Sequence, residues 1–168
     1  MLLQARSNGT LLAGERSLRC ALGRGGVAAA IDKREGDLRT PLGRWPLRRV
    51  YFRPDKLAAP QTRLPATALT DTMGWCDAPE DPAYNRLVAL PYPASAERLW
   101  REDDVYDLLV ELGYNDDPVV PGRGSAIFWH LARPDFSGTE GCVAIAREDM
   151  LWALAQLGPE DALEIVPA

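Results

Sequence analysis

A chain of 168 residues, 46% of them hydrophobic, is long enough to bury the core of one domain. Its net charge of −5 argues against a nucleic-acid or anionic-membrane surface, because both need concentrated lysine and arginine. The three cysteines lie far apart, with no Cys-x-x-Cys pair and only one histidine, so we expect no metal site and no cofactor.

The ends and the cysteine count suggest where the chain works. Residues 1–17 lack the apolar run of a signal peptide, and no stretch approaches the roughly 20 apolar residues of a membrane span. We expect a monomer, and in a monomer an odd number of cysteines leaves at least one thiol free. The sequence therefore predicts a soluble cytoplasmic protein that acts on small polar substrates or binds protein partners.

Strands and turns are predicted for the first half of the chain. Residues 10–31 are short apolar runs broken by glycine turns, which favours two or three strands of a meander. Residues 33–46 contain too much glycine and proline for a helix, and a strand is expected at residues 47–52. Residues 53–95 hold seven of the fourteen prolines and are interpreted as an ordered insertion that packs along a cleft as a lid.

The middle of the second half is predicted to contain two longer strands. Residues 94–103 are interpreted as a helical turn or short helix. Residues 105–114 and 125–131 are apolar segments of strand length, separated by a loop rich in proline and glycine. The second of these strands ends near the histidine.

One helix is predicted near the C-terminus. Residues 147–158 place Met150, Leu154 and Leu157 on one face, with acidic residues in the first turn. Residues 162–166 are expected to be a closing strand. Because there is no internal repeat and no second core, we expect a single mainly-β domain over residues 1–168, with one or two short helices.

The histidine and one cysteine form a candidate catalytic pair. His130 lies twelve residues before Cys142, which follows Gly141 in a Thr-x-Gly-Cys-Val turn. A thiolate attacks carbonyl carbon, and a nearby imidazole can hold its proton and lower the cysteine pKa. The amides around Gly141 and Cys142 are expected to converge on a developing oxyanion. The alternative is a buried apolar cysteine beside a core histidine, and the spacing alone does not decide between them.

Two separated segments resemble one known family. The sequence HLARPDFSGTEGCVAI, from His130 to Ile145, resembles the signature of the L,D-transpeptidase catalytic domain, or YkuD domain, in which a histidine precedes a Ser/Thr-x-Gly-Cys-hydrophobic element. Further upstream, KREGDLRTPLGRW resembles that family's Lys-x-x-Gly-Asp-x-x-Thr-Pro-x-Gly-x-aromatic segment. Taken alone, this second segment indicates a structural turn before a strand.

The resemblance implies a β-sandwich-like fold with Cys142 as nucleophile, His130 as base and Gly141 in the same site. It implies that Cys142 forms a thioester with a peptidoglycan stem peptide or muropeptide, without a cofactor, and passes the acyl group to an amine or to water. His130 would accept the thiol proton and protonate the leaving amine, which suits an imidazole whose pKa lies near the working pH. The family also suggests a location in the periplasm or cell envelope, whereas the missing signal peptide predicts the cytoplasm.

The chain departs from the family pattern at two positions. Many members have an arginine two places after the cysteine and often a histidine before the glycine, where this chain has Ala144 and Glu140. Arg123 or Arg133 would have to replace the missing guanidinium in substrate binding. The alternative for either arginine is a solvated surface position.

Other residues are candidates for contacting a substrate. Tyr114 and Asn115 follow the strand expected beside that of His130 and could bind a peptide backbone, although a turn is the alternative for Asn115. Thr139, in the cysteine motif, is a further substrate-binding candidate. Trp75 either covers the cleft or pins the insertion by packing.

Two further functions remain open. Ala144, Glu140 and the missing export signal favour a non-catalytic member that binds cell-wall peptides or a protein partner. A cytoplasmic L,D-carboxypeptidase or amidase acting on muropeptides would reconcile the chemistry with the expected location. The distance from the Cys142 sulfur to the His130 ring would discriminate between them. A close, exposed pair would favour the enzymes, whereas a pair held apart or sealed in the core would favour the binding protein.

Overall fold

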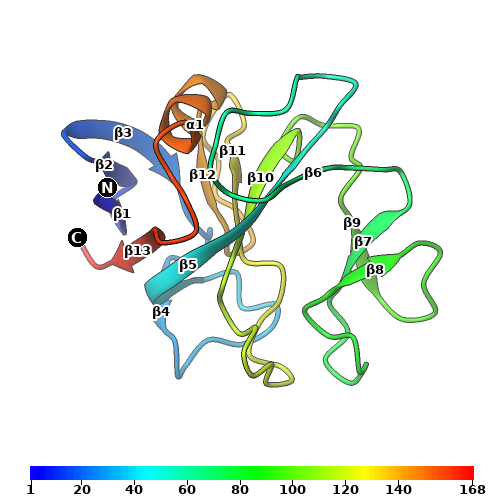
Figure 1. The fold of residues 1–168 in the computed structure, drawn as a ribbon. Coiled ribbons are helices and arrows are strands. Elements are labelled where there is room, and N and C mark those ends of the chain that lie inside the picture. Colours follow the sequence, from blue (N-terminus) through cyan, green and yellow to red (C-terminus); the bar gives the residue numbers. More distant parts are fainter.

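Strand β5 (Thr40–Phe52) is the longest element of the computed structural model, which describes residues 1–168 (Figure 1). Its first half pairs with β13 (Ala162–Val166) and its second half with β10 (Leu108–Leu112). Other strands connect β13 to β10, so the sheet closes on itself. In order, these are β1 (Leu3–Arg6), β2 (Thr10–Ala13), β3 (Arg16–Ala21), β12 (Val143–Ile145) and β11 (Phe128–Leu131), with β4 (Val27–Ala29) and β6 (Ala66–Ala68) added on β5.

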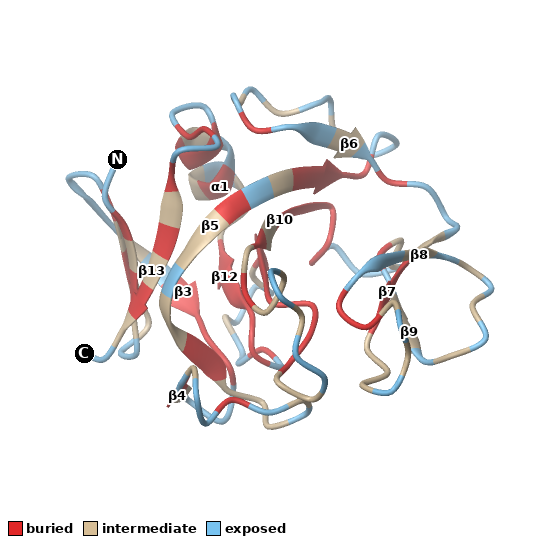
Figure 2. Cartoon of the chain, turned by 60° about the horizontal axis from the view of Figure 1, so that its bottom comes forward, coloured by how far each residue is buried: buried red, intermediate tan, exposed pale blue.

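The main hydrophobic core lies inside this sheet and against the helix α1 (Arg147–Leu154). In Figure 2, β5 alternates between buried and more exposed residues, whereas β12 is buried throughout. Met150 and Leu154 of α1 are buried in the core, as the helical spacing predicts. The predicted mainly-β single domain with a short helix is confirmed. None of its helices has both the length and the apolar character needed to cross a membrane.

The second part of the proline-rich insertion, which in the structure continues to residue 98, forms a small sheet of its own, whereas β6 in its first part joins the main sheet. Strand β7 (Met73–Cys76) pairs with β8 (Leu87–Ala89) and with β9 (Ala96–Arg98), beside the main sheet (Figure 1). The helix expected at residues 94–103 is therefore wrong. Local composition permitted a helical turn, but antiparallel pairing with β7 takes the backbone groups, and the following Leu99 is buried.

The side chain of Trp75 packs against aromatic residues of the main sheet. It is only 4% exposed, and its ring contacts Phe128 edge-on at a centroid distance of 5.1 Å. It belongs to a second hydrophobic cluster that also contains Tyr51, Tyr106 and Cys142. Of the two alternatives for Trp75, the structure shows the packed residue that pins the insertion.

A buried asparagine connects the insertion to the main sheet. Asn85 Oδ1 accepts hydrogen bonds from Trp75 Nε1 (2.9 Å) and the Ala126 amide (3.1 Å). Its Nδ2 donates to the carbonyls of Tyr114 (3.1 Å) and Asn115 (2.8 Å). These four bonds use the full capacity of the side-chain amide. The insertion is thereby fixed to the turn after β10 and to the segment before β11.

Candidate active site

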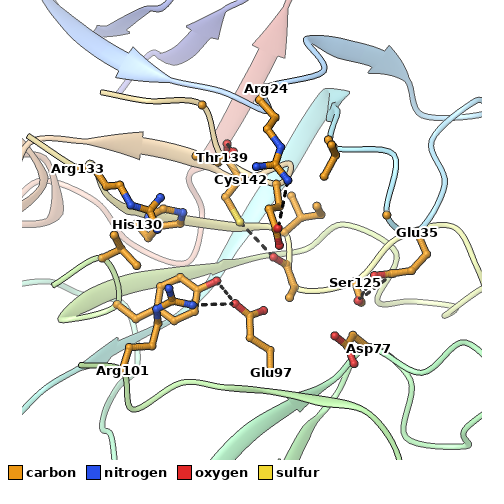
Figure 3. Close-up of a pocket in the computed structure, with 18 residues that line it drawn as sticks. Arg24, Glu35, Asp77, Glu97, Arg101, Ser125, His130, Arg133, Thr139 and Cys142 are labelled. Carbon is orange, nitrogen blue, oxygen red and sulfur yellow. Dashed lines mark hydrogen bonds and ion pairs between the residues drawn. The ribbon is translucent and has the colours of Figure 1, made fainter. Parts of the chain in front are cut away.

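A cavity of about 500 Å³ opens between the main sheet and the small sheet (Figure 3). His130 and Cys142 line it from the main sheet, and Asp77 and Glu97 line it from the insertion. Glu35, from the upstream motif, lines it as well. Three segments that are distant in the sequence therefore meet at one cavity.

The parallel pairing of β11 and β12 sets the relative positions of the two candidate catalytic residues. His130 lies opposite Ala144, so Phe128 lies opposite Cys142, and the Phe128 amide donates to Cys142 Sγ (3.3 Å). Side chains alternate along a strand, so His130 and Cys142 project from the same face as diagonal neighbours. Figure 3 shows both on one wall of the cavity, where they are 6% and 7% exposed.

Burial keeps this pair neutral at rest. It raises the pKa of Cys142 to about 12, against the opposing effect of the Phe128 amide, and lowers the pKa of His130 to about 4. The resting pair is therefore a thiol and a neutral imidazole near pH 7. The expected cysteine of lowered pKa, and the imidazole with a pKa near the working pH, do not describe this resting state.

The hydrogen bonds of the pair show where the protons lie. His130 Nδ1 is 2.9 Å from the Leu131 carbonyl, which can only accept, so Nδ1 carries the proton and Nε2 is left as the base. Cys142 Sγ donates to the Ala126 carbonyl at 3.2 Å. The unprotonated nitrogen and the thiol are thus the groups available for proton transfer.

Thr139 organises the turn before the nucleophile. Its Oγ1 donates to the Cys142 carbonyl (2.7 Å) and accepts from the Gly141 amide (3.1 Å). The Gly141 amide is therefore occupied in this structure and is not free for the predicted oxyanion. Gly141 has φ +137°, and a Cβ there would lie 3.0 Å from the Arg39 carbonyl oxygen, so glycine is needed for backbone approach.

The upstream motif lies directly behind this turn. Lys33 is buried, and its Nζ contacts Asp37 Oδ1 (2.6 Å) and the Arg34 carbonyl (2.7 Å). The Gly23 amide donates to Thr40 Oγ1 (2.8 Å), and a Cβ on Gly23 would lie 2.3 Å from a backbone carbonyl of this motif. These contacts give the motif a structural role. Only residues 33–39 form the predicted turn, however, because Thr40 and the residues after it already belong to β5.

Comparison with known families identifies the chain. The model of the L,D-transpeptidase catalytic domain, YkuD, matches residues 2–165. The chain belongs to this family. A search of curated proteins found no match. Among solved structures, this L,D-transpeptidase domain is similar to Mycobacterium tuberculosis L,D-transpeptidase 1, with 12% identity and a TM-score of 0.45 over 98% of this chain and 60% of that chain.

Three predicted substrate-binding residues of this L,D-transpeptidase domain lie outside the cavity. Tyr114 is buried, and its hydroxyl donates to the Arg123 carbonyl (2.5 Å). Asn115 bonds the backbone of its own loop, and the Arg123 side chain donates to the Ile31 carbonyl (2.6 Å). The polar groups of Tyr114 and Asn115 bond the loop between β10 and β11, and Arg123 joins that loop to the segment after β4, so the structure does not support contact with substrate.

Arg133 and Thr139 do line the cavity of the L,D-transpeptidase domain, and so do two arginines that sequence reasoning missed. Arg24 follows β3 and lies 3.5 Å from Glu140, and Arg101 follows β9. The glycine-rich setting of Arg24 suggested only a turn, and Arg101 lay in the segment expected to be helical. Together with Arg133, these two arginines place guanidinium groups in the cavity. The family pattern has an arginine at the position of Ala144, which this chain lacks.

Other polar residues of the cavity also escaped prediction. Asp77, Glu97 and Tyr106 carry no motif, and only the path of the insertion brings the first two to the cavity. No cluster of three or more histidine, cysteine, aspartate or glutamate side chains is placed to hold a metal ion. The chemistry of the cavity therefore centres on one thiol, one imidazole and several carboxylates and guanidiniums.

Cys142 of the L,D-transpeptidase domain is expected to react with iodoacetamide before the other two cysteines. All three thiols are buried, but only Cys142 lines the cavity. Because its pKa is raised to about 12, alkylation should be slow at pH 7 and rise about tenfold per pH unit up to pH 10. Peptide mapping after limited labelling measures this. Earlier labelling of Cys20 or Cys76, or a rate that is independent of pH, would contradict the expectation.

Proposed function

We propose that the chain is a cysteine-dependent L,D-transpeptidase that acts on peptidoglycan stem peptides through a thioester at Cys142, with His130 as base. The observation that carries the proposal is the placement of both residues on one wall of a cavity, in a member of this family. The polar walls of the cavity suit a charged peptide substrate.

In the first half of the reaction, His130 Nε2 accepts the proton of Cys142 as Sγ attacks the substrate carbonyl. The Phe128 amide already donates to the sulfur and stabilises the developing thiolate. The C–N bond then breaks, and the imidazolium delivers its proton to the leaving amine. Because burial disfavours the imidazolium, it is a strong acid in this environment and returns that proton readily. The products are the thioester and a free amine.

In the second half, the acyl group passes from Cys142 to an acceptor. An amine acceptor gives a new peptide bond, and water gives a carboxylate, which makes the chain an L,D-carboxypeptidase. Arg24, Arg101 and Arg133 line the cavity beside the reacting residues and can bind substrate carboxylates, because guanidinium pairs with carboxylate through parallel hydrogen bonds.

The test is intact-mass measurement after mixing the protein with a stem tetrapeptide, with and without an amine-bearing acceptor peptide. We expect a mass increase that maps to Cys142 and a cross-linked product when acceptor is present. Cys20→Ala is the matched control, because it removes a buried thiol outside the cavity. A tripeptide as the sole product would identify a carboxypeptidase. Binding without adduct or product would identify a non-catalytic member.

A further inference from the structure

We propose that Glu97 is a second proton-transfer residue of this cavity, and that it accepts the proton of an amine acceptor as that amine attacks the Cys142 thioester. This inference rests on the proposed function and extends it to a residue outside both sequence motifs. It assigns a chemical role to the insertion, which otherwise only forms a wall of the cavity.

The two carboxylate oxygens of Glu97 have different surroundings. Oε1 accepts a hydrogen bond from the Tyr106 hydroxyl (2.5 Å) and lies 3.9 Å from an Arg101 nitrogen. Oε2 has no hydrogen-bond partner in the protein, and Figure 3 shows it in the cavity. A carboxylate that is held by one oxygen and free at the other is positioned to receive a proton from a ligand.

Strand pairing in the insertion directs Glu97 toward the reacting residues. Glu97 lies opposite Trp75, whose ring packs on Phe128 beneath the cavity. Residues opposite each other in an antiparallel pair project to the same face. Tyr106, which holds Oε1, also contacts the His130 ring edge-on at a centroid distance of 5.2 Å. Glu97 therefore lines the same cavity as Cys142 and His130, and Tyr106 contacts both Glu97 and His130.

The nearest cation does not need Glu97 to balance its charge. Arg101, the nearest guanidinium, already makes two 2.7 Å hydrogen bonds to the Asp103 carboxylate. Its contact with Glu97 is much longer, at 3.9 Å. Neutralising Arg101 therefore does not require Glu97, whereas a cationic ligand in the cavity would meet its free oxygen.

The surroundings of Glu97 adjust its proton affinity to the neutral range. Burial raises its pKa to about 7, and nearby Asp77 and Glu140 act in the same direction. Tyr106 and Arg101 oppose the shift. A base is most effective when its pKa lies near the working pH, whereas His130, with a pKa of about 4, is the weaker base of the two.

The proposed step is balanced in atoms and charge. An acceptor R–NH₃⁺ transfers one proton to Glu97 Oε2 and becomes R–NH₂. The amine attacks the thioester carbonyl, the C–N bond forms and the C–S bond breaks. The departing thiolate receives the second amine proton through His130 Nε2. The products are an amide, the Cys142 thiol, neutral His130 and protonated Glu97, which then releases its proton to solvent.

The experiment separates acylation from transfer. Wild type and Glu97→Gln are first acylated with stem tetrapeptide, and loss of the adduct is then followed by mass after addition of an ammonium-bearing acceptor peptide. We expect Glu97→Gln to form the adduct but to transfer it about 10²-fold more slowly. With hydroxylamine, which is mostly uncharged near pH 7, the two proteins should react at similar rates. Glu102→Gln, which removes an exposed carboxylate outside the cavity, is the matched control and should keep peptide transfer within a few-fold of wild type.

The pH profile of transfer gives a second readout. In the wild type the rate should fall as the pH drops below about 7, because protonation removes the base. Above pH 7 the wild-type rate should level off, whereas the rate of Glu97→Gln should keep rising with pH, because only the small unprotonated fraction of the acceptor amine can attack when the base is missing. Equal transfer rates in wild type and Glu97→Gln, or equal slowing with hydroxylamine, would overturn the role of Glu97 alone. Absence of any Cys142 adduct in the wild type would instead overturn the proposed function and this role with it.

Discussion

Replacing His130 by alanine is expected to lower the rate of Cys142 acylation by about 10²–10⁴-fold, the range typical of general acid–base catalysis. At rest Cys142 is a thiol of raised pKa, so little thiolate exists without a base to take the proton. His130 Nε2 is the base available on the same wall of the cavity. The measurement is the single-turnover rate of adduct formation with stem tetrapeptide.

The matched control for this variant is His130→Asn. An asparagine amide can keep the donor to the Leu131 carbonyl that His130 Nδ1 now supplies, but it places no base at the position of Nε2. Both variants should lose acylation, and His130→Asn should stay nearer to wild type in thermal stability. If His130→Asn forms the adduct at the wild-type rate, His130 is a structural residue and not the base.

Replacing Asn85 by alanine is expected to lower the free energy of unfolding by about 3 kcal/mol or more. The change removes four hydrogen bonds in a buried position and leaves groups of Trp75 and Ala126 without partners. Each buried group left unsatisfied costs about 1–3 kcal/mol, although relaxation and water entry keep the sum below the simple total. Urea unfolding monitored by circular dichroism measures the loss.

Asn115→Ala is the control for Asn85→Ala. Both asparagines have positive φ, 56° for Asn85 and 50° for Asn115, so alanine meets a similar backbone penalty at each position. Asn115 is only half-buried and bonds its own loop, where water can replace the lost bonds. We expect it to cost at least 1 kcal/mol less than Asn85→Ala. Equal losses would show that backbone strain, and not the buried network, dominates.

The sequence predicted the parts of the fold that depend on local pattern. The start of α1, the strand at residues 47–52 and the closing strand β13 follow from short-range periodicity and turn residues. The strand at β9 did not, because its conformation depends on hydrogen bonds to β7, about twenty residues earlier in the chain. Propensity over ten residues carries no information about such a partner.

The candidate site was also predictable from the sequence only in part. The resemblance to the L,D-transpeptidase signature, and not the spacing alone, selected His130 and Cys142, and the parallel pairing of their strands places them side by side. Their protonation could not be predicted, because it depends on burial, which a single sequence does not show. Tyr114 and Asn115 were placed near the correct strand, but their polar groups are directed into their own loop.

The close packing behind Cys142 limits how this sequence can diverge. A Cβ on Gly23 would lie 2.3 Å from the Leu38 carbonyl oxygen, and one on Gly141 would lie 3.0 Å from the Arg39 carbonyl oxygen. Two neighbouring carbonyls of the upstream motif thus fill the space that a side chain would need at positions far apart in the sequence. Tolerance to substitution is therefore low at Gly23 and Gly141 as well, although neither residue takes part in proton transfer. A library of variants designed to use other acyl acceptors can therefore change the side chains that line the cavity. Gly23 and Gly141 have to be kept, because the backbone of the upstream motif passes so close to them.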